Sequence, residues 1–145
     1  MQMFLPYHRF DLSAAVLDNA RLGNQCYREA LTLIRGGWQH HPASKMWRGY
    51  ERALAQYGLA CAVEMSRRDH WRSEVITRWL THWAFLFKQL PDTGMPPWIG
   101  DDEFHLMHRR VLLAKAPEHY RQYWPELEPA VKVDGQWPYL WPKGE

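Results

Sequence analysis

The sequence lacks the features that mark exported, membrane-bound or disulfide-stabilised proteins. Its 145 residues include two cysteines, Cys26 and Cys61, which form no CxxC pair and fall on apolar helical stripes, so we expect buried, reduced thiols. No apolar run approaches the ~20 residues that a membrane span needs, and no basic segment followed by an apolar one opens the chain. We therefore expect a cytoplasmic protein that binds no membrane.

Motifs that bind nucleotides or build common hydrolases are also missing. The chain has no Walker loop, no dinucleotide-binding glycine fingerprint and no nucleophile elbow, which makes most nucleotide-dependent enzymes poor fits. The formal net charge of +2 is by itself no evidence for a polyanionic partner. Lysine is scarce among the basic residues, and arginine is the residue better suited to bidentate contacts with phosphates and to stacking on bases. This bias favours nucleic acid as a partner.

Aromatic residues and histidine, by contrast, are abundant. Nine Trp, seven Tyr and five Phe are more than a small core can bury with their polar edges satisfied. Some of them must therefore line a surface or a pocket. Eight His add groups that titrate near neutral pH or bind metals.

The pattern of apolar residues predicts an all-α protein, a single domain over residues 1–145 with about four helices. Apolar residues recur with helical spacing over the segments 11–35, 42–68, 69–90 and 103–115. Pro42 suits the first turn of the second segment, and Pro117 ends or restarts the fourth. We expect segment 69–90 at the centre of the bundle. Residues 1–10 are predicted to form an extended arm, and the C-terminal residues an irregular aromatic tail across the helices.

Charged and polar residues lie at the edge of the apolar stripe in segment 18–35, where we find Arg21, Gln25, Arg28 and Glu29. A helix that packs only for stability keeps such groups on its far side, so this arrangement suggests a polar cleft. In that interpretation Glu29 stabilises or accepts charge while a bond at a sugar or base is broken, and the arginines hold phosphate. The alternative is a solvated helix edge with ion pairs.

A second basic cluster surrounds the predicted helix start at Pro42. It consists of His40, His41, Lys45, Arg48 and Arg52, together with the aromatic Trp47. The N-terminus of a helix carries free N–H groups that bind phosphate, and nearby cations add to that attraction. The cluster therefore predicts either an anion site or merely a basic helix start.

Two later segments combine basic and aromatic residues. His105, His108 and Arg109 lie close together on the fourth predicted helix, where residues three or four apart are neighbours. No ligand set completes a metal shell around them, so we expect contacts with phosphate or substrate, or packed histidines, and no metal. Tyr120 lies in the segment EHYRQYW, where aromatic and basic residues interleave. These side chains either stack on unpaired bases or pin the tail to the helices.

Several of these segments, in the same order, resemble the pyrimidine-dimer DNA glycosylase family of the endonuclease V type. Tyr27, Arg28 and Glu29 resemble its first-helix motif, His41 or His40 its histidine before the second helix, and HYRQYW its aromatic segment beside the DNA. The stretches RLGNQ, HPASKMWRGYE, PPWIGDDEFHLMHR and YLWP resemble a divergent bacterial and phage branch of the family. The resemblance implies an all-helical domain that binds double-stranded DNA, extrudes a nucleotide and breaks its N-glycosidic bond.

In that family the motif glutamate is catalytic, and the nucleophile is the α-amine that removal of the initiator methionine exposes. The amine attacks C1′ of the sugar and forms a Schiff base that allows strand cleavage. Here Gln2 is a large residue that should hinder removal of Met1. Either the Met1 amine is then the nucleophile, or Glu29 activates water and no lyase step follows.

We therefore predict a monomeric DNA glycosylase, with or without abasic-site lyase activity, that acts on a damaged or modified pyrimidine and needs no cofactor or metal. Glu29 and Met1 are the predicted catalytic residues. The residues predicted to bind DNA or substrate are Arg21, Gln25, Arg28, His41, Lys45, Trp47, Arg48, His105, His108, Arg109 and Tyr120. The alternatives are a DNA-binding module without activity and an enzyme that transfers a group to a modified DNA base.

Overall fold

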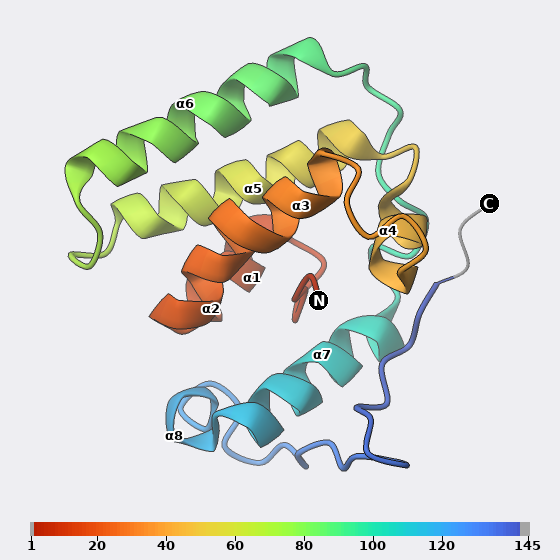
Figure 1. Ribbon diagram of the computed structural model, residues 1–145. Coiled ribbons are helices and arrows are strands. Elements are labelled where there is room, and N and C mark those ends of the chain that lie inside the picture. Colours follow the sequence, from red (N-terminus) through yellow and green to blue (C-terminus); the bar gives the residue numbers. More distant parts are fainter. Residues whose placement is uncertain (1, 143–145) are drawn as a thin grey trace.

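The computed structural model describes residues 2–142, which form helices and no strand, so the predicted all-α class is confirmed. In chain order the elements are α1 (Phe10–Val16), α2 (Asn19–Asn24), the π-helical turn η1 (Gln25–Glu29), α3 (Ala30–Ile34), α4 (Pro42–Trp47), α5 (Glu51–Ser66), α6 (Ser73–Gln89), α7 (Asp102–Lys115) and α8 (Pro117–Tyr120). Figure 1 shows α5 between α6 and the first helices. α7 and α8 lie on the far side of the first helices from α5. No helix in the described range is long and apolar enough to cross a bilayer.

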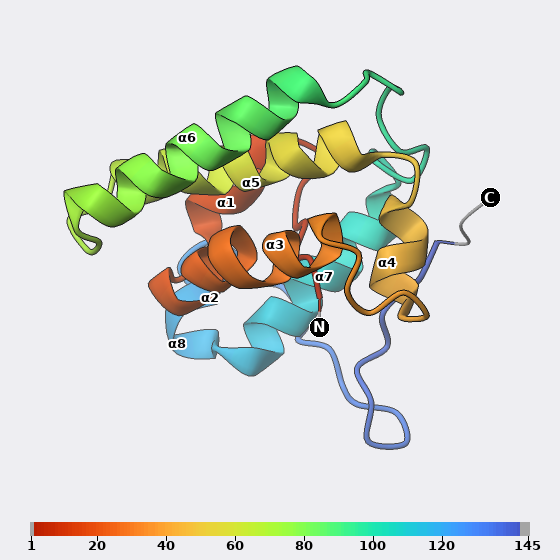
Figure 2. The ribbon, with the colours of Figure 1, turned by 45° about the horizontal axis from the view of Figure 1, so that its top comes forward.

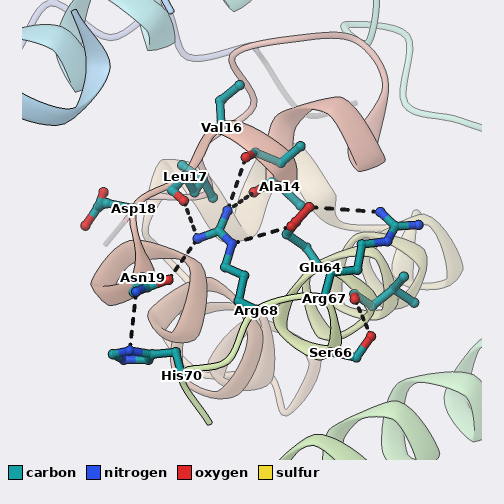
Figure 3. A network of polar contacts seen from close by, with 12 residues as sticks. Ala14, Val16, Leu17, Asp18, Asn19, Glu64, Ser66, Arg67, Arg68 and His70 are labelled. Carbon is teal, nitrogen blue, oxygen red and sulfur yellow. Dashed lines mark hydrogen bonds and ion pairs between the residues drawn. The ribbon is translucent and has the colours of Figure 1, made fainter. Parts of the chain in front are cut away.

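The single first helix predicted over residues 11–35 is wrong, because the chain becomes extended at Leu17 and a new helix starts after Asp18. The Asp18 carboxylate accepts the Arg21 N–H and caps α2. Across the break, the guanidinium group of Arg68 donates hydrogen bonds to the carbonyls of Ala14, Ala15 and Leu17 and to the Asn19 side chain (Figure 3). Carbonyls at the end of a helix lack partners within it, so a distant arginine stabilises this break.

The turn η1 between α2 and α3 contains one residue more than an ordinary α-helical turn. In it the Ala30 N–H bonds to the Gln25 carbonyl, five residues earlier. The three elements therefore form one continuous helical rod with a single wide turn. Such π-helical turns are found frequently at functional sites. Here the turn contains Gln25 and Glu29, both among the predicted site residues.

The second predicted helix, 42–68, is also divided in two. α4 begins at Pro42 as predicted, and His41 Nδ1 caps it by accepting the Ala43 N–H at 3.0 Å. The backbone then turns at Gly49, whose φ of +88° is unfavourable for residues that carry a Cβ atom. The next helix, α5, begins at Glu51. A glycine in the left-handed region thus redirects the chain between α4 and α5.

The centre of the bundle is α5, and the prediction that segment 69–90 lies there is wrong. α5 has eight buried residues, whereas Trp83 is the single buried residue of α6. Figures 1 and 2 both show α6 along the outside of α5. Gly58 permits the close contact between them, since a Cβ atom there would lie 2.5 Å from the Trp83 indole ring. α6 therefore covers the core from one side.

Two segments without regular helix complete the fold. The N-terminal arm lies between α3 and α7 (Figures 1 and 2), and its residues Met3, Phe4 and Leu5 are buried in the core. After α8 the aromatic tail packs on α7, where the Ala130 N–H donates to the Arg110 carbonyl at 3.0 Å. α7 therefore contacts both segments, and the arm is enclosed within the protein.

Candidate active-site cleft

Both polar backbone groups of Leu5 are bound by histidines of α7. The Leu5 N–H donates to His108 Nδ1, and His105 Nδ1 donates to the Leu5 carbonyl, each at 2.8 Å. The other nitrogen of His105 accepts the Gly100 N–H at 2.9 Å. Both imidazoles are buried, and burial lowers the pKa of each, that of His108 to about 3. Two neutral histidines therefore clamp the arm onto α7.

Gln25 of η1 binds the next part of the arm. Its Oε1 accepts the Phe4 N–H at 2.8 Å, and its Nε2 donates to the Gln2 carbonyl at 2.9 Å. The hydroxyl of Tyr57 contacts the Phe4 carbonyl at 2.6 Å and Gln25 Oε1 at 3.0 Å. An amide side chain offers both a donor and an acceptor to extended backbone. Gln25 thus ties the beginning of the arm to the turn that bears Glu29.

An open cleft of about 540 Å³ adjoins the first residues of the arm. It is lined by Gln2, Phe4, Ala20, Arg21, Asn24, Gln25, Glu29, Lys115, Trp137 and Tyr139. These residues come from the arm, from α2 and η1, from the end of α7 and from the tail. Segments that are far apart in the sequence therefore meet around one carboxylate, Glu29, and two cations, Arg21 and Lys115.

Some polar atoms of the cleft have a hydrogen-bond or ion-pair partner in the protein, and others have none among the described residues. Arg21 forms an ion pair with Asp18 at 3.2 Å. Gln2 Nε2 and the Tyr139 hydroxyl are buried and have no hydrogen-bond partner within residues 2–142. Burial raises the pKa of Tyr139, which keeps its hydroxyl protonated. Buried polar groups in folded proteins are nearly always paired, so these two enclosed donors in the wall of the cleft are exceptions among the described residues.

Four predicted DNA contacts are instead buried and engaged inside the protein. His105 and His108 clamp the arm, as described above. Tyr120 is fully buried, and its hydroxyl donates to the Asp18 carboxylate. Trp47 is 2% exposed and packs among other aromatic rings of the core. DNA cannot touch these side chains in the folded protein, so their predicted contacts give way to roles in packing and positioning.

Five further predicted contacts lie outside the cleft. Arg109 donates to a carbonyl of the arm at 2.6 Å and so also holds that segment in place. Arg28 is exposed and is not among the lining residues. Lys45 and Arg48 line a separate cavity of about 410 Å³ beside α4, and His41 caps that helix. The second basic cluster and the cleft are therefore distinct places on the protein.

Of the predicted site residues, the structure brings Arg21, Gln25 and Glu29 together at the cleft. Met1, the other predicted catalytic residue, lies outside the described residues. Lys115 lines the cleft and was not predicted, although it lies on the fourth helix two turns beyond the second clamping histidine. That spacing was the available signal. The tail residues of the cleft carry no local signal that could have found them.

Comparison with known proteins finds a match for the part of the chain that runs from the arm to the start of α6. The family model of the pyrimidine dimer DNA glycosylases matches residues 1–76. No curated protein and no solved structure matches the chain. The matched range includes Gln25 and Glu29, whereas Lys115 and the tail lie beyond it. The chain belongs to the pyrimidine dimer DNA glycosylase family.

Proposed function

We propose that this protein is a DNA glycosylase that removes a damaged or modified pyrimidine from double-stranded DNA. The observation that carries the proposal is the cleft at Glu29, since the arm and η1, which both line it, fall in the range matched by the family. Its volume of about 540 Å³ is typical of sites that enclose a small molecule. Enzymes that act on a base within a duplex turn the nucleotide out of the helix into such a pocket.

Glu29 is the group that we assign to the reacting sugar. Cleavage of the bond between C1′ and the base leaves positive charge on the sugar, and a nearby carboxylate stabilises that charge. The same carboxylate can take a proton from a water molecule that attacks C1′. Arg21, which lines the same cleft, is suited to hold a phosphate of the extruded nucleotide.

We assign recognition of the base to residues of the arm and the tail that line the cleft. Phe4 and Trp137 line the cleft with aromatic rings on which a pyrimidine can stack. Gln2 and Tyr139 also line the cleft, and their amide and hydroxyl groups can donate to the carbonyl oxygens of a pyrimidine ring if the side chains turn into the cleft.

Substitution of Glu29 by Gln tests the proposal, because it removes the charge and keeps the shape of the side chain. On duplexes that contain pyrimidine dimers or hypermodified thymines, we expect Glu29→Gln to reduce base release at least ~100-fold. DNA affinity should stay equal or rise, since a negative charge near the phosphates is lost. Glu74→Gln, which changes an exposed carboxylate in the first turn of α6, is the matched control.

Two results would count against the proposal. One is base release by Glu29→Gln at the rate of the unaltered protein. The other is a complete lack of base release across the panel although the protein binds each duplex with strong salt dependence. The second result would favour the DNA-binding module without activity.

A further inference from the structure

We propose that Trp38 is a wedge that enters duplex DNA and stacks on the bases beside the extruded nucleotide. The residue lies in the loop 35–41, which joins α3 to α4 (Figures 1 and 2) and does not line the cleft. This role rests on the proposed function, since it takes double-stranded DNA as the partner and places a nucleotide in the cleft. Trp38 is not among the residues that the sequence predicts to contact DNA.

The side chain of Trp38 is exposed to a degree that no other tryptophan of the protein reaches. Its exposed fraction is 62%, whereas the other eight tryptophans, all in the described part of the chain, are buried or half-buried. Within residues 2–142 its one aromatic neighbour is His41, whose ring centre lies 6.3 Å away. Contact with an apolar partner removes such a surface from water and is favourable. Most of the indole ring is therefore available to a ligand.

The backbone at Trp38 is held in a conformation that bulky residues rarely adopt. Its φ is +56°, in the left-handed region. The Trp38 carbonyl accepts the His41 N–H at 2.9 Å, and the Gly37 carbonyl accepts the Ser44 hydroxyl at 3.0 Å. These hydrogen bonds maintain the strained backbone that presents the ring. Residues in such conformations are concentrated at functional sites.

The chain around this loop carries positive charge. No acidic residue lies between Glu29 and Glu51. The same interval contains three exposed cations, Arg35, Lys45 and Arg48, and none of them forms an ion pair within residues 2–142. Cations beside an exposed aromatic ring bind nucleic acid, because they attract the phosphates while the ring stacks on a base. The loop therefore suits DNA better than an uncharged apolar partner.

The loop lies close enough to the cleft to reach the same stretch of DNA. The ring of His41, next to Trp38, lies 5.6 Å from that of Trp141. The ring of Trp141 lies 5.5 Å from that of Tyr139, which lines the cleft. From Glu29 to the end of α3 the helical rod rises by about 8 Å, or roughly two base steps along one strand. A wedge beyond the end of this rod therefore meets bases close to the nucleotide in the cleft.

Such a wedge assists extrusion from a duplex. A side chain inserted between bases separates them and bends the DNA helix, and a nucleotide must lose its stacking before it leaves the duplex. The indole ring restores stacking contacts for the bases left behind. In a single strand the bases are much less constrained by pairing and stacking, so the wedge contributes little there.

Photochemical crosslinking tests the contact on the full-length protein. The probes are duplexes with one stable abasic-site analogue, in which 5-iodouracil replaces in turn each base next to the analogue or opposite it. Near-ultraviolet light joins iodouracil, with loss of the iodine, to an aromatic ring that stacks on it, and mass spectrometry of the digested adduct locates that residue. We expect the adduct at Trp38. Adducts at other residues alone, or no adduct, would overturn the proposal.

Three variants separate the ring of Trp38 from the stability of the fold. Trp38→Ala should weaken binding to the abasic duplex about 10-fold, because stacking on a base is lost, and Trp38→Phe should keep most of the affinity. Phe85→Ala is the matched control, since that ring on α6 is 61% exposed and lies outside the loop. All three should unfold at the same urea concentration as the unaltered protein, because both side chains are largely exposed. Equal DNA affinities of Trp38→Ala and Phe85→Ala would refute the wedge and favour a protein partner at the loop.

Base release separates the wedge from the proposed function. On a duplex with a modified pyrimidine, Trp38→Ala should release the base at least ~10-fold more slowly than the unaltered protein, while on the single strand the two rates should agree within ~2-fold. A loss of equal size on both substrates would contradict the wedge. Base release by the unaltered protein without an adduct at Trp38 would leave the glycosylase proposal standing and remove the wedge. An adduct at Trp38 without base release would support the wedge and count against glycosylase activity on the substrates used.

Discussion

Substitution of His108 by Asn should make the fold less sensitive to acid. In the folded protein the imidazole is buried and neutral, and its Nδ1 accepts the Leu5 N–H. Burial lowers the pKa of His108 to about 3, from an ordinary value of 6.5. Because the folded state resists protonation, the stabilisation is complete above pH 6.5 and is lost progressively as the pH falls from 6.5 toward 3.

The expected size of the effect follows from these two values. Between pH 7 and pH 5 the unfolded chain takes up a proton at His108 and the folded protein does not, which lowers the free energy of unfolding by about 2 kcal/mol. The Asn side chain does not titrate, and its Oδ1 can accept the Leu5 N–H. Urea titrations at both pH values, followed by circular dichroism, measure the loss. With slopes of roughly 1–3 kcal/mol per M, the wild-type midpoint should fall by about 1 M more than that of the variant.

The comparison between pH values isolates the titration from the loss of packing. His108→Asn leaves a smaller side chain beside Phe104, so we expect lower stability of the variant at both pH values. His105 and the other titrating groups are present in both proteins, and their contributions cancel. Equal losses of stability between pH 7 and pH 5 in the two proteins would refute the argument that His108 is buried in its neutral form.

Two further substitutions test contacts on which the cleft and the first helices depend. Gln25→Leu should lower the free energy of unfolding by about 2 kcal/mol or more, because the Phe4 N–H and the Gln2 carbonyl lose their buried partner. Urea titration measures this loss, and an unchanged midpoint would contradict it. Arg68→Met should cost roughly 2 kcal/mol in the same assay, because the carbonyls at the end of α1 lose a charged donor. The control Arg67→Met, at a mostly exposed side chain, should cost less than about 1 kcal/mol, and equal losses in the two variants would count against the role of Arg68.

Helix boundaries were predictable where they depend on nearby residues. α4 begins at Pro42 and α8 at Pro117, since proline lacks an N–H and fits the first turn of a helix. The breaks at Leu17 and Gly49 were missed, because the apolar periodicity continues through both. The first break is stabilised by Arg68, and no pattern within the first segment indicates that contact.

The candidate site was predictable to a similar degree. Arg21 and Glu29 lie at the edge of an apolar stripe, and helical spacing was enough to place them on one side of their rod. The spacing of His105 and His108 shows that they share a helix face, but not what that face meets. Their partner is the backbone of Leu5, and contacts with backbone leave no trace in residue types. The clamp was therefore out of reach of sequence patterns.

The long sequence separation of the arm's contacts determines when the cleft can assemble during protein synthesis. Leu5 and Pro6 are translated before α7, and their partners on that helix follow 100 and 103 positions later. Such distant contacts form late, because the chain between them must first be made and ordered. Until α7 leaves the ribosome, the arm lacks half of its partners. A nascent or truncated chain that lacks α7 therefore has no complete cleft, and the proposed action on DNA must await the synthesis of α7.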